Sequence, residues 1–232
     1  EASMTTSTFY PAADLVLGQF YRATWNGGAC PNNLYSGFAC LFRFDLSSIP
    51  ASASIDSAYI RLVQVSAPEG AYNATQAFYK ISDANGDWIE GTKNNTLAGA
   101  GEPCYNAKCA DGAGGVTTAW AGGAGCKAAG TDYVNTILAS KVTNRSDSQY
   151  TAYQIDFNAD GLAVLESWFG EATNNGLLLK EYVNSAIWGL KEHATADYRP
   201  LLSVTYTEAA SGALLKVNMN GNMQSLTGGF HG

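Results

Sequence analysis

The side chains best suited to metal binding lie in one short segment, Asp156-Phe157-Asn158-Ala159-Asp160-Gly161. Carboxylate and amide oxygens at alternate positions match the opening of a calcium-binding loop, D-x-N-x-D-G. A calcium loop takes a bidentate glutamate at its twelfth position, where this chain has Ser167. The same pattern also suits the start of a helix, in which an asparagine accepts a backbone N–H. We expect helix capping, and we keep calcium as a secondary possibility with Asp156, Asn158 and Asp160 as its ligands.

Residues suited to catalysis are few. The two histidines, His193 and His231, have no serine or cysteine nucleophile signature beside them. Glu181, Glu192 and Asp197 flank successive expected strands, and carboxylate pairs perform glycosidase chemistry. Carboxylates on loops are more often only solvated charges, so we expect the protein not to be an enzyme.

The five cysteines occupy segments with the composition of loops. Cys30 and Cys40 flank a stretch rich in Gly, Pro and Asn, and Cys104, Cys109 and Cys126 lie in a glycine-rich stretch. Loops of exported proteins are common places for disulfides. We expect a Cys30–Cys40 bond and one bond among the other three. The remaining cysteine would be a shielded thiol, an intermolecular link or a metal ligand.

Composition bears on the compartment and the partners. Charged residues make up 14% of the 232 residues and the net charge is -7, with no cluster of Lys and Arg, so we expect no nucleic-acid partner. No segment approaches the length of about 18 apolar residues that a membrane span requires. The chain begins at Glu1 without methionine, which we interpret as a mature secreted form after removal of a signal peptide. Three sequons would permit glycosylation there, at Asn73, Asn94 and Asn144.

Strands are the main elements that must position these residues. Phe42, Phe44 and Leu46 alternate with polar residues, the period of a half-buried strand, and Pro50 follows. Other short segments repeat the pattern between turns rich in Gly, Asn, Ser and Pro, which is typical of a sandwich. The expected strands are Thr5 to Tyr10, Leu15 to Thr24, Ala39 to Leu46, Ala58 to Val65, Thr75 to Ile81, Gln154 to Phe157, Gly176 to Lys180, Ala186 to Lys191 and Leu201 to Thr207.

Two segments interrupt the strand pattern. After Asn158, an apolar face predicts one short helix, which we expect to cover an open end of the sandwich; that face is formed by Leu162, Leu165, Trp168 and Phe169. Asn94 to Asp132 is rich in Gly and Ala and contains three cysteines, so we expect a long surface excursion held by a disulfide.

Several motifs in sequence order resemble the DNRLRE domain, a family of secreted β-sandwich domains of bacterial and archaeal surface proteins. They are "RFDLSSIP" with "SAYIRL", then "WIEGT", "SWF" with "NNGLLLK", and finally "KEH" with "RPLLSVTY", so that the resemblance spans Thr5 to Tyr206. The hexapeptide that names the family is not intact in this chain. The resemblance implies an all-β, antiparallel, jelly-roll-like sandwich over residues 1–207.

Some members of that family resemble carbohydrate-binding modules for anionic polysaccharides such as alginate. Sites of that kind stack sugars on aromatic rings and bind acid groups with Lys or Arg. The possible glycan contacts are Trp25, Trp120, Tyr182 and Lys191, with Tyr133, Trp188 and Lys180 as further candidates. The alternative is that tryptophans on strands and on the helix, Trp88, Trp168 and Trp188, belong to the core.

Residues 208–232 form a tail beyond the resemblance. Within Ala213 to Asn220, the apolar residues Leu215, Val217 and Met219 alternate with polar ones, and Phe230 is the aromatic residue that follows. A lone amphipathic strand needs a partner for its backbone and for its apolar face. We therefore expect a C-terminal extension strand that pairs either with its own sandwich or with a neighbouring copy.

Two functions remain open from the sequence. The first is an extracellular structural subunit that polymerises head-to-tail by donating this strand to the next copy, with Leu215, Val217, Met219 and Phe230 as assembly residues. The second is a stand-alone carbohydrate-binding or adhesive module of the cell surface. We favour the filament, with copies of the chain itself as partners, a polysaccharide as a further possibility, and no cofactor.

Overall fold

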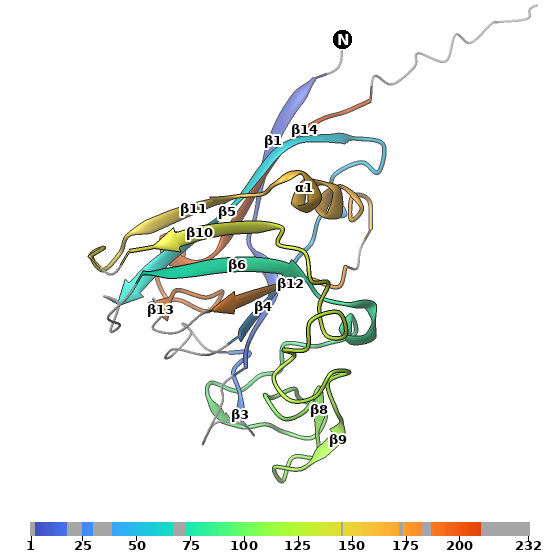
Figure 1. Cartoon of the computed structure of the whole chain (residues 1–232), viewed down its shortest axis with the longest axis vertical. Coiled ribbons are helices and arrows are strands. Elements are labelled where there is room, and N and C mark those ends of the chain that lie inside the picture. The colour runs from blue at the N-terminus through green and yellow to red at the C-terminus, as the bar shows by residue number, and fades with distance from the viewer. Residues whose placement is uncertain are drawn as a thin grey trace, which may run out of the picture.

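The computed structural model describes residues 3–17, 25–29, 39–66, 73–144, 146–171, 174–181 and 187–209. Two antiparallel five-stranded sheets pack face to face, and a lobe of short strands extends from the end remote from the start of β1 (Figure 1). The predicted all-β sandwich with one short helix is confirmed over these residues. The predicted extension strand of residues 213–220 lies outside them, as does Phe230.

The first sheet is built around the long strand β5. Its order is β1 (Met4–Phe9), β14 (Leu201–Thr207), β5 (Ser54–Ser66) and β11 (Ala152–Asp156), and β13 (Ile187–Trp188) also pairs with β5. β14 is thus paired on both sides, with β1 from Leu202 to Thr207 and with β5 from Leu201 to Thr207.

The second sheet also has five strands, and β2 is the first of them along the chain. Its order is β10 (Ala139–Thr143), β6 (Ala74–Lys80), β12 (Leu177–Glu181), β4 (Ala39–Phe44) and β2 (Pro11–Leu17). Two small sheets pair β3 (Trp25–Asn26) with β7 (Thr96–Leu97) and β8 (Cys109–Ala110) with β9 (Val116–Thr118). The short 3-10 helices are η2 (Asp83–Asn85) and η3 (Ala196–Tyr198).

The second sheet is buried on both faces. One face packs into the main core between the sheets, with Phe42 and Phe78 among its members. The other face forms a second core in which Leu15 and Leu41 pack with aromatic residues of the lobe; the lobe contributes Tyr105, Trp120, Cys126 and Tyr133. The expectation of a half-buried strand at β4 is therefore correct only toward its end, since Ala39 to Phe42 are all buried.

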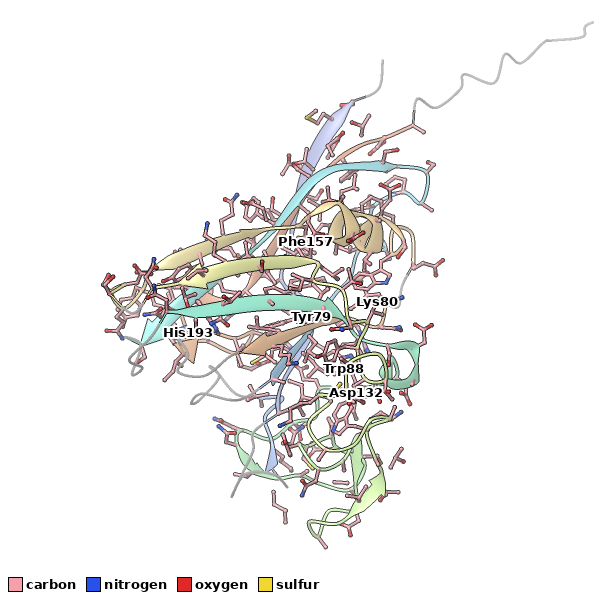
Figure 2. All side chains as sticks on the ribbon, in the orientation of Figure 1. Tyr79, Lys80, Trp88, Asp132, Phe157 and His193 are labelled. Atoms are coloured by element: carbon pink, nitrogen blue, oxygen red, sulfur yellow. The ribbon has the colours of Figure 1, made fainter. Side chains whose placement is uncertain are left out.

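The segment Asn94 to Asp132 is correctly predicted to be an excursion, but it is folded rather than merely held by a disulfide. Asp132 is completely buried and accepts hydrogen bonds from Asn85 Nδ2 at 2.8 Å, Gly122 N at 2.7 Å and Ala128 N at 2.8 Å. Gly122 is required there because a Cβ would lie 2.6 Å from Asp132 Oδ2. Figure 2 shows Asp132 and Trp88 together where this lobe meets the sandwich.

The disulfide predicted among the three cysteines of the lobe is wrong in this structure. Cys104, Cys109 and Cys126 are free thiols. Cys126 belongs to the core beneath the second sheet, whereas Cys104 packs with small residues of the lobe. Cys109 is half-buried. The predicted Cys30–Cys40 bond stays a prediction, because Cys30 lies outside the described residues.

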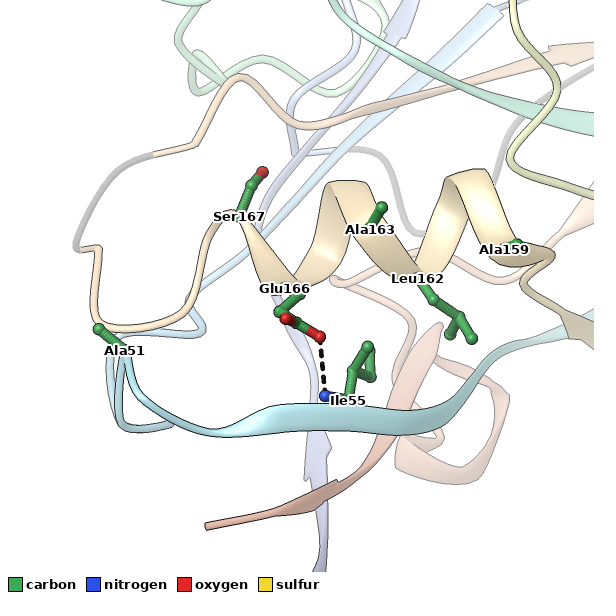
Figure 3. Close-up of a pocket in the computed structure, with 7 residues that line it drawn as sticks. All are labelled: Ala51, Ile55, Ala159, Leu162, Ala163, Glu166 and Ser167. Atoms are coloured by element: carbon green, nitrogen blue, oxygen red, sulfur yellow. Dashed lines mark hydrogen bonds between the residues drawn. The ribbon is translucent and has the colours of Figure 1, made fainter. Parts of the chain in front are cut away.

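The helix α1 (Ala159–Glu166) closes one end of the sandwich, as predicted. Its buried residue Leu165 joins the main core together with Trp168 and Phe169, which follow the helix. At its end, Glu166 Oε2 accepts a 2.9 Å hydrogen bond from Ile55 N at the start of β5 (Figure 3). A shallow groove of about 570 Å³ lies between the two elements, lined by Ala51, Ile55, Ala159, Leu162, Ala163, Glu166 and Ser167. No described helix has the length and hydrophobicity that crossing a membrane requires.

Candidate functional site

The strand β1 ends the first sheet, and none of the described strands pairs with its outer side. It reads Met-Thr-Thr-Ser-Thr-Phe, without a charged residue or a proline. Thr5, Ser7 and Phe9 are partly buried on one face, and Met4 is 69% exposed on the other. An uncharged strand of this length with open backbone groups is a template for pairing with another chain.

The other edges of the two five-stranded sheets are protected. β2 begins with Pro11, which has no N–H to donate. The backbone N–H of Asp14 donates to Glu90 Oε1 at 3.1 Å and is therefore not open to pairing with another strand. β10 and β11 carry charges, and the bridge between Ala139 and Phe157 closes the two sheets on that side. Natural sheets use these devices to prevent edge-to-edge pairing, so the open edge of β1 is distinctive among the described edges of the two large sheets.

The chain leaves the sandwich next to this edge. Thr207, the last residue of β14, is the register partner of Met4, and Glu208 N donates to Ser3 O at 3.4 Å. The sheet is lined on its inner face here by Tyr206, which Phe169 contacts edge-on with ring centroids 6.1 Å apart. An apolar layer therefore lies close to the edge of β1, and the tail of residues 208–232 starts at the same end of the molecule.

The predicted metal loop is the start of α1. Asn158 Oδ1 accepts a 2.9 Å hydrogen bond from Gly161 N, and its Nδ2 donates to Ile137 O at 2.7 Å. Asp156, on β11, accepts from Gln154 Nε2 at 2.7 Å. Asp160 is exposed in the first helical turn. The side chain of Asn158 thus has the geometry of the capping alternative.

The predicted glycan contacts that the structure describes do not form an exposed aromatic surface. Trp120 is 1% exposed, and its indole N–H donates to Cys104 O at 2.8 Å, so its ring cannot stack on a sugar. Tyr133 and Trp188 are buried as well, and Lys180 donates to the Tyr133 hydroxyl at 2.7 Å. The ring of Trp25 and all of Tyr182 lie outside the described residues. Lys191 faces acidic side chains of its own chain, at 2.5 Å from Glu90.

The remaining candidates are the three sequon residues, the two histidines and the predicted carboxylates, of which Glu192 lies beside Lys191. The three sequon residues Asn73, Asn94 and Asn144 are exposed, so their glycosylation stays a prediction that the geometry permits. His193 contacts the ring of Tyr198 and accepts from Thr195 N at 3.1 Å, and His231 lies outside the described residues. Asp197 is exposed on η3, and the side chain of Glu181 is not among those described.

Two features of the described structure, the open edge of β1 and a cluster of three acids, do not follow from the sequence pattern. The strand β1 was predicted, but alternation within a strand does not reveal which strand ends a sheet. A cluster of Asp14, Glu90 and Glu192, whose carboxylates lie within 4.8 Å of one another, was also missed. Of its members the sequence suggests Glu192 as a candidate acid, and the other local signal is Asp14, an acidic residue inside an apolar strand. Comparison of the chain with protein-family models and with curated proteins found no match.

Proposed function

We propose that this protein is an extracellular structural subunit that assembles head-to-tail into a surface filament. In this proposal, residues 213–220 of one copy add a strand to the open edge of β1 in the next. The observation that carries it is the uncharged edge of β1, which no described strand covers, in a chain whose residues 213–220 include alternating apolar and polar side chains. The resemblance to the DNRLRE domain, with its secreted surface proteins, is part of the proposal.

The direction and reach of the chain support donation to a neighbour. A tail that continues the direction of β14 would run antiparallel to β1 of a neighbour in the same orientation, because β1 and β14 are antiparallel. Residues 208–220, if extended, span on the order of 40 Å. A compact body of about 200 residues has a radius of gyration near 17 Å and thus a diameter of roughly 40–45 Å. An extended tail is thus about as long as one subunit is wide, which is long enough for it to leave its own body and enter an adjacent subunit.

The expected free energy of association is moderate, so assembly should depend on the concentration of the protein. Burying the side chains of Leu215, Val217 and Met219 contributes on the order of 5–9 kcal/mol before costs. Ordering the tail and losing translational freedom offset much of this gain. Because β1 carries no charge and the donated strand only Lys216, salt should change the affinity little.

Electron microscopy and sedimentation of three proteins test the proposal. The intact chain and Asn218→Asp, which alters the polar side of the strand, should form filaments. Val217→Asp, which places a charge on the apolar side, should stay monomeric. Because Val217→Asp still presents its own β1, small amounts added to the intact chain should cap growing ends and shorten the filaments.

The opposite results would contradict the proposal. An intact chain that remains monomeric at millimolar concentration, or Val217→Asp filaments of normal length, would exclude donation by this strand. The carbohydrate-binding alternative has less support, because Trp120 is buried and Lys191 is paired within the chain.

A further inference from the structure

Three carboxylates from distant parts of the sequence meet beside the edge of β2. Asp14 lies on β2, Glu90 follows η2, and Glu192 lies between β13 and η3. One oxygen of each lies within 4.8 Å of the others. The site lies outside the assembly edge of β1, and nothing in the proposed function requires it.

Asp14 has an oxygen without a donor in the described part of the chain. Its side chain is completely buried; Oδ2 accepts a 2.7 Å hydrogen bond from Lys191 N, but Oδ1 has no hydrogen-bond partner there. Glu192 Oε2 is buried without a partner in the same way. A buried carboxylate oxygen that lacks a donor is costly, and native structures that retain one commonly bind an ion or water at that point.

Lys191 supplies one positive charge to this group of three acids. Its Nζ donates to both oxygens of Glu90 at 2.5 Å, lies 3.3 Å from Glu192 Oε1, and donates to Ala12 O at 3.4 Å. One ammonium cannot balance three carboxylates. Consistent with this deficit, burial raises the pKa of Asp14 well above its ordinary value, and burial likewise raises the pKa of Glu192.

We infer that Asp14, Glu90 and Glu192 form a binding site for a divalent cation, with Ca²⁺ as the best fit. All of the atoms that could coordinate the ion are oxygens, including the Ala12 carbonyl oxygen. Hard oxygen ligands suit Ca²⁺ rather than Zn²⁺. Ca²⁺ also accepts irregular coordination completed by water, which Mg²⁺ tolerates less.

The ammonium of Lys191 neutralises part of this cluster in the structure, because it contacts Glu90 and Glu192, and it would compete with a cation for these two carboxylates. The Lys191 side chain is 29% exposed, so it can turn toward solvent when an ion enters. The ion would then join β2, the segment after η2 and the turn after β13, and binding to the folded state alone would stabilise the protein.

Competition between the Lys191 ammonium and Ca²⁺ provides a test that distinguishes a cation site from a cluster with only a structural role. Isothermal titration with calcium chloride and thermal unfolding with and without calcium should be compared for four proteins. The intact chain should bind Ca²⁺ and unfold at a higher temperature with it. Asp14→Asn should lose this response, and Lys191→Gln should bind Ca²⁺ on the order of tenfold more tightly or better, because the competing charge is gone. Glu171→Gln, an exposed carboxylate outside the cluster, should behave like the intact chain.

A second variant covers the case in which Asp14→Asn does not fold. Glu192→Gln then replaces it, with the same expected loss of calcium binding. Absence of binding heat for both the intact chain and Lys191→Gln at millimolar calcium would overturn the inference. Equal calcium affinity of the intact chain and Lys191→Gln would also overturn it. Filament formation is not measured here, so failure of this site leaves the assembly proposal unaffected.

Discussion

Asn85 donates a 2.8 Å hydrogen bond from Nδ2 to Asp132 Oδ1, and both side chains are completely buried. The contact joins η2, which follows a strand of the second sheet, to the end of the lobe. Asn85 Oδ1 also accepts from Ala121 N at 3.1 Å. Two polar side chains thus satisfy the backbone of a glycine-rich segment that has few strands of its own.

Removal of the Asp132 carboxylate should loosen the lobe. Asp132→Ala leaves Asn85 Nδ2 and the backbone N–H groups of Gly122 and Ala128 without their acceptor, and we expect a loss of about 3 kcal/mol or more in the free energy of unfolding. Urea unfolding followed by tryptophan fluorescence measures this loss. Asp197→Ala, at an exposed position, is the matched control, and an equal effect of the two substitutions would contradict the prediction.

The thiols of the lobe should differ in reactivity. Burial, followed by the negative charge of Asp132, raises the pKa of Cys126, and burial raises the pKa of Cys104. Because the thiolate is the reactive form, iodoacetamide at pH 8 should label the half-buried Cys109 first and the other two only after unfolding. Peptide mass spectrometry identifies the labelled sites. A disulfide-linked peptide that contains two of these cysteines would instead favour the original prediction from the sequence.

Asn158 should matter as a helix cap. Asn158→Ala removes the acceptor for Gly161 N, and we expect a loss of about 1 kcal/mol in stability. Asn158→Asp keeps an acceptor oxygen and should lose less. Thermal unfolding of both variants checks this order. If Asn158 were a calcium ligand, Asn158→Ala would lose a stabilisation by calcium that Asn158→Asp keeps.

Glu102 should make part of the stability depend on acid pH. Burial alone would raise its pKa, but hydrogen bonds from Thr92 and from Gly99 N outweigh burial and lower it from the ordinary value of 4.5. A carboxyl with a lowered folded-state pKa stabilises the fold above its ordinary pKa, and this contribution is lost as the pH falls through the lowered value. Glu102→Gln should therefore be less stable than the intact chain at pH 7.

The same variant gives the acid side of the comparison. The difference in urea midpoint between Glu102→Gln and the intact chain should shrink as the pH falls from 4.5 toward 3, because the carboxyl of the intact chain becomes neutral as well. Urea unfolding at several pH values measures it. A difference that stays constant over this range would show that the charge of Glu102 contributes nothing.

Local sequence patterns predict the strands well where one strand has one clear period. Leu201 to Thr207 is β14 with the same bounds, and Ala39 to Leu46 contains β4. The strand β10, Ala139–Thr143, was missed because three of its five residues are exposed and its apolar pattern is weak. Of the predicted strands, Leu15 to Thr24 and Ala186 to Lys191 lie only partly within the described residues.

Contacts between distant residues explain what could not be predicted. Trp120 looked like a sugar platform because the sequence does not show that the lobe covers the second sheet. Asp14 meets Glu90 and Glu192 only after three segments converge, and no spacing in the chain encodes that meeting. The cap at Asn158 was predictable, since its partner lies three residues away.

The position of β14 between β1 and β5 has a mechanical consequence. A pull on the chain at residue 208, directed along the strand, would load the backbone bonds to both neighbours in shear rather than one after another. Bonds loaded in shear must break together, so the strand should resist force far better than a hairpin opened from its end. Tension that enters through the tail would thus spread at once into the centre of the sheet.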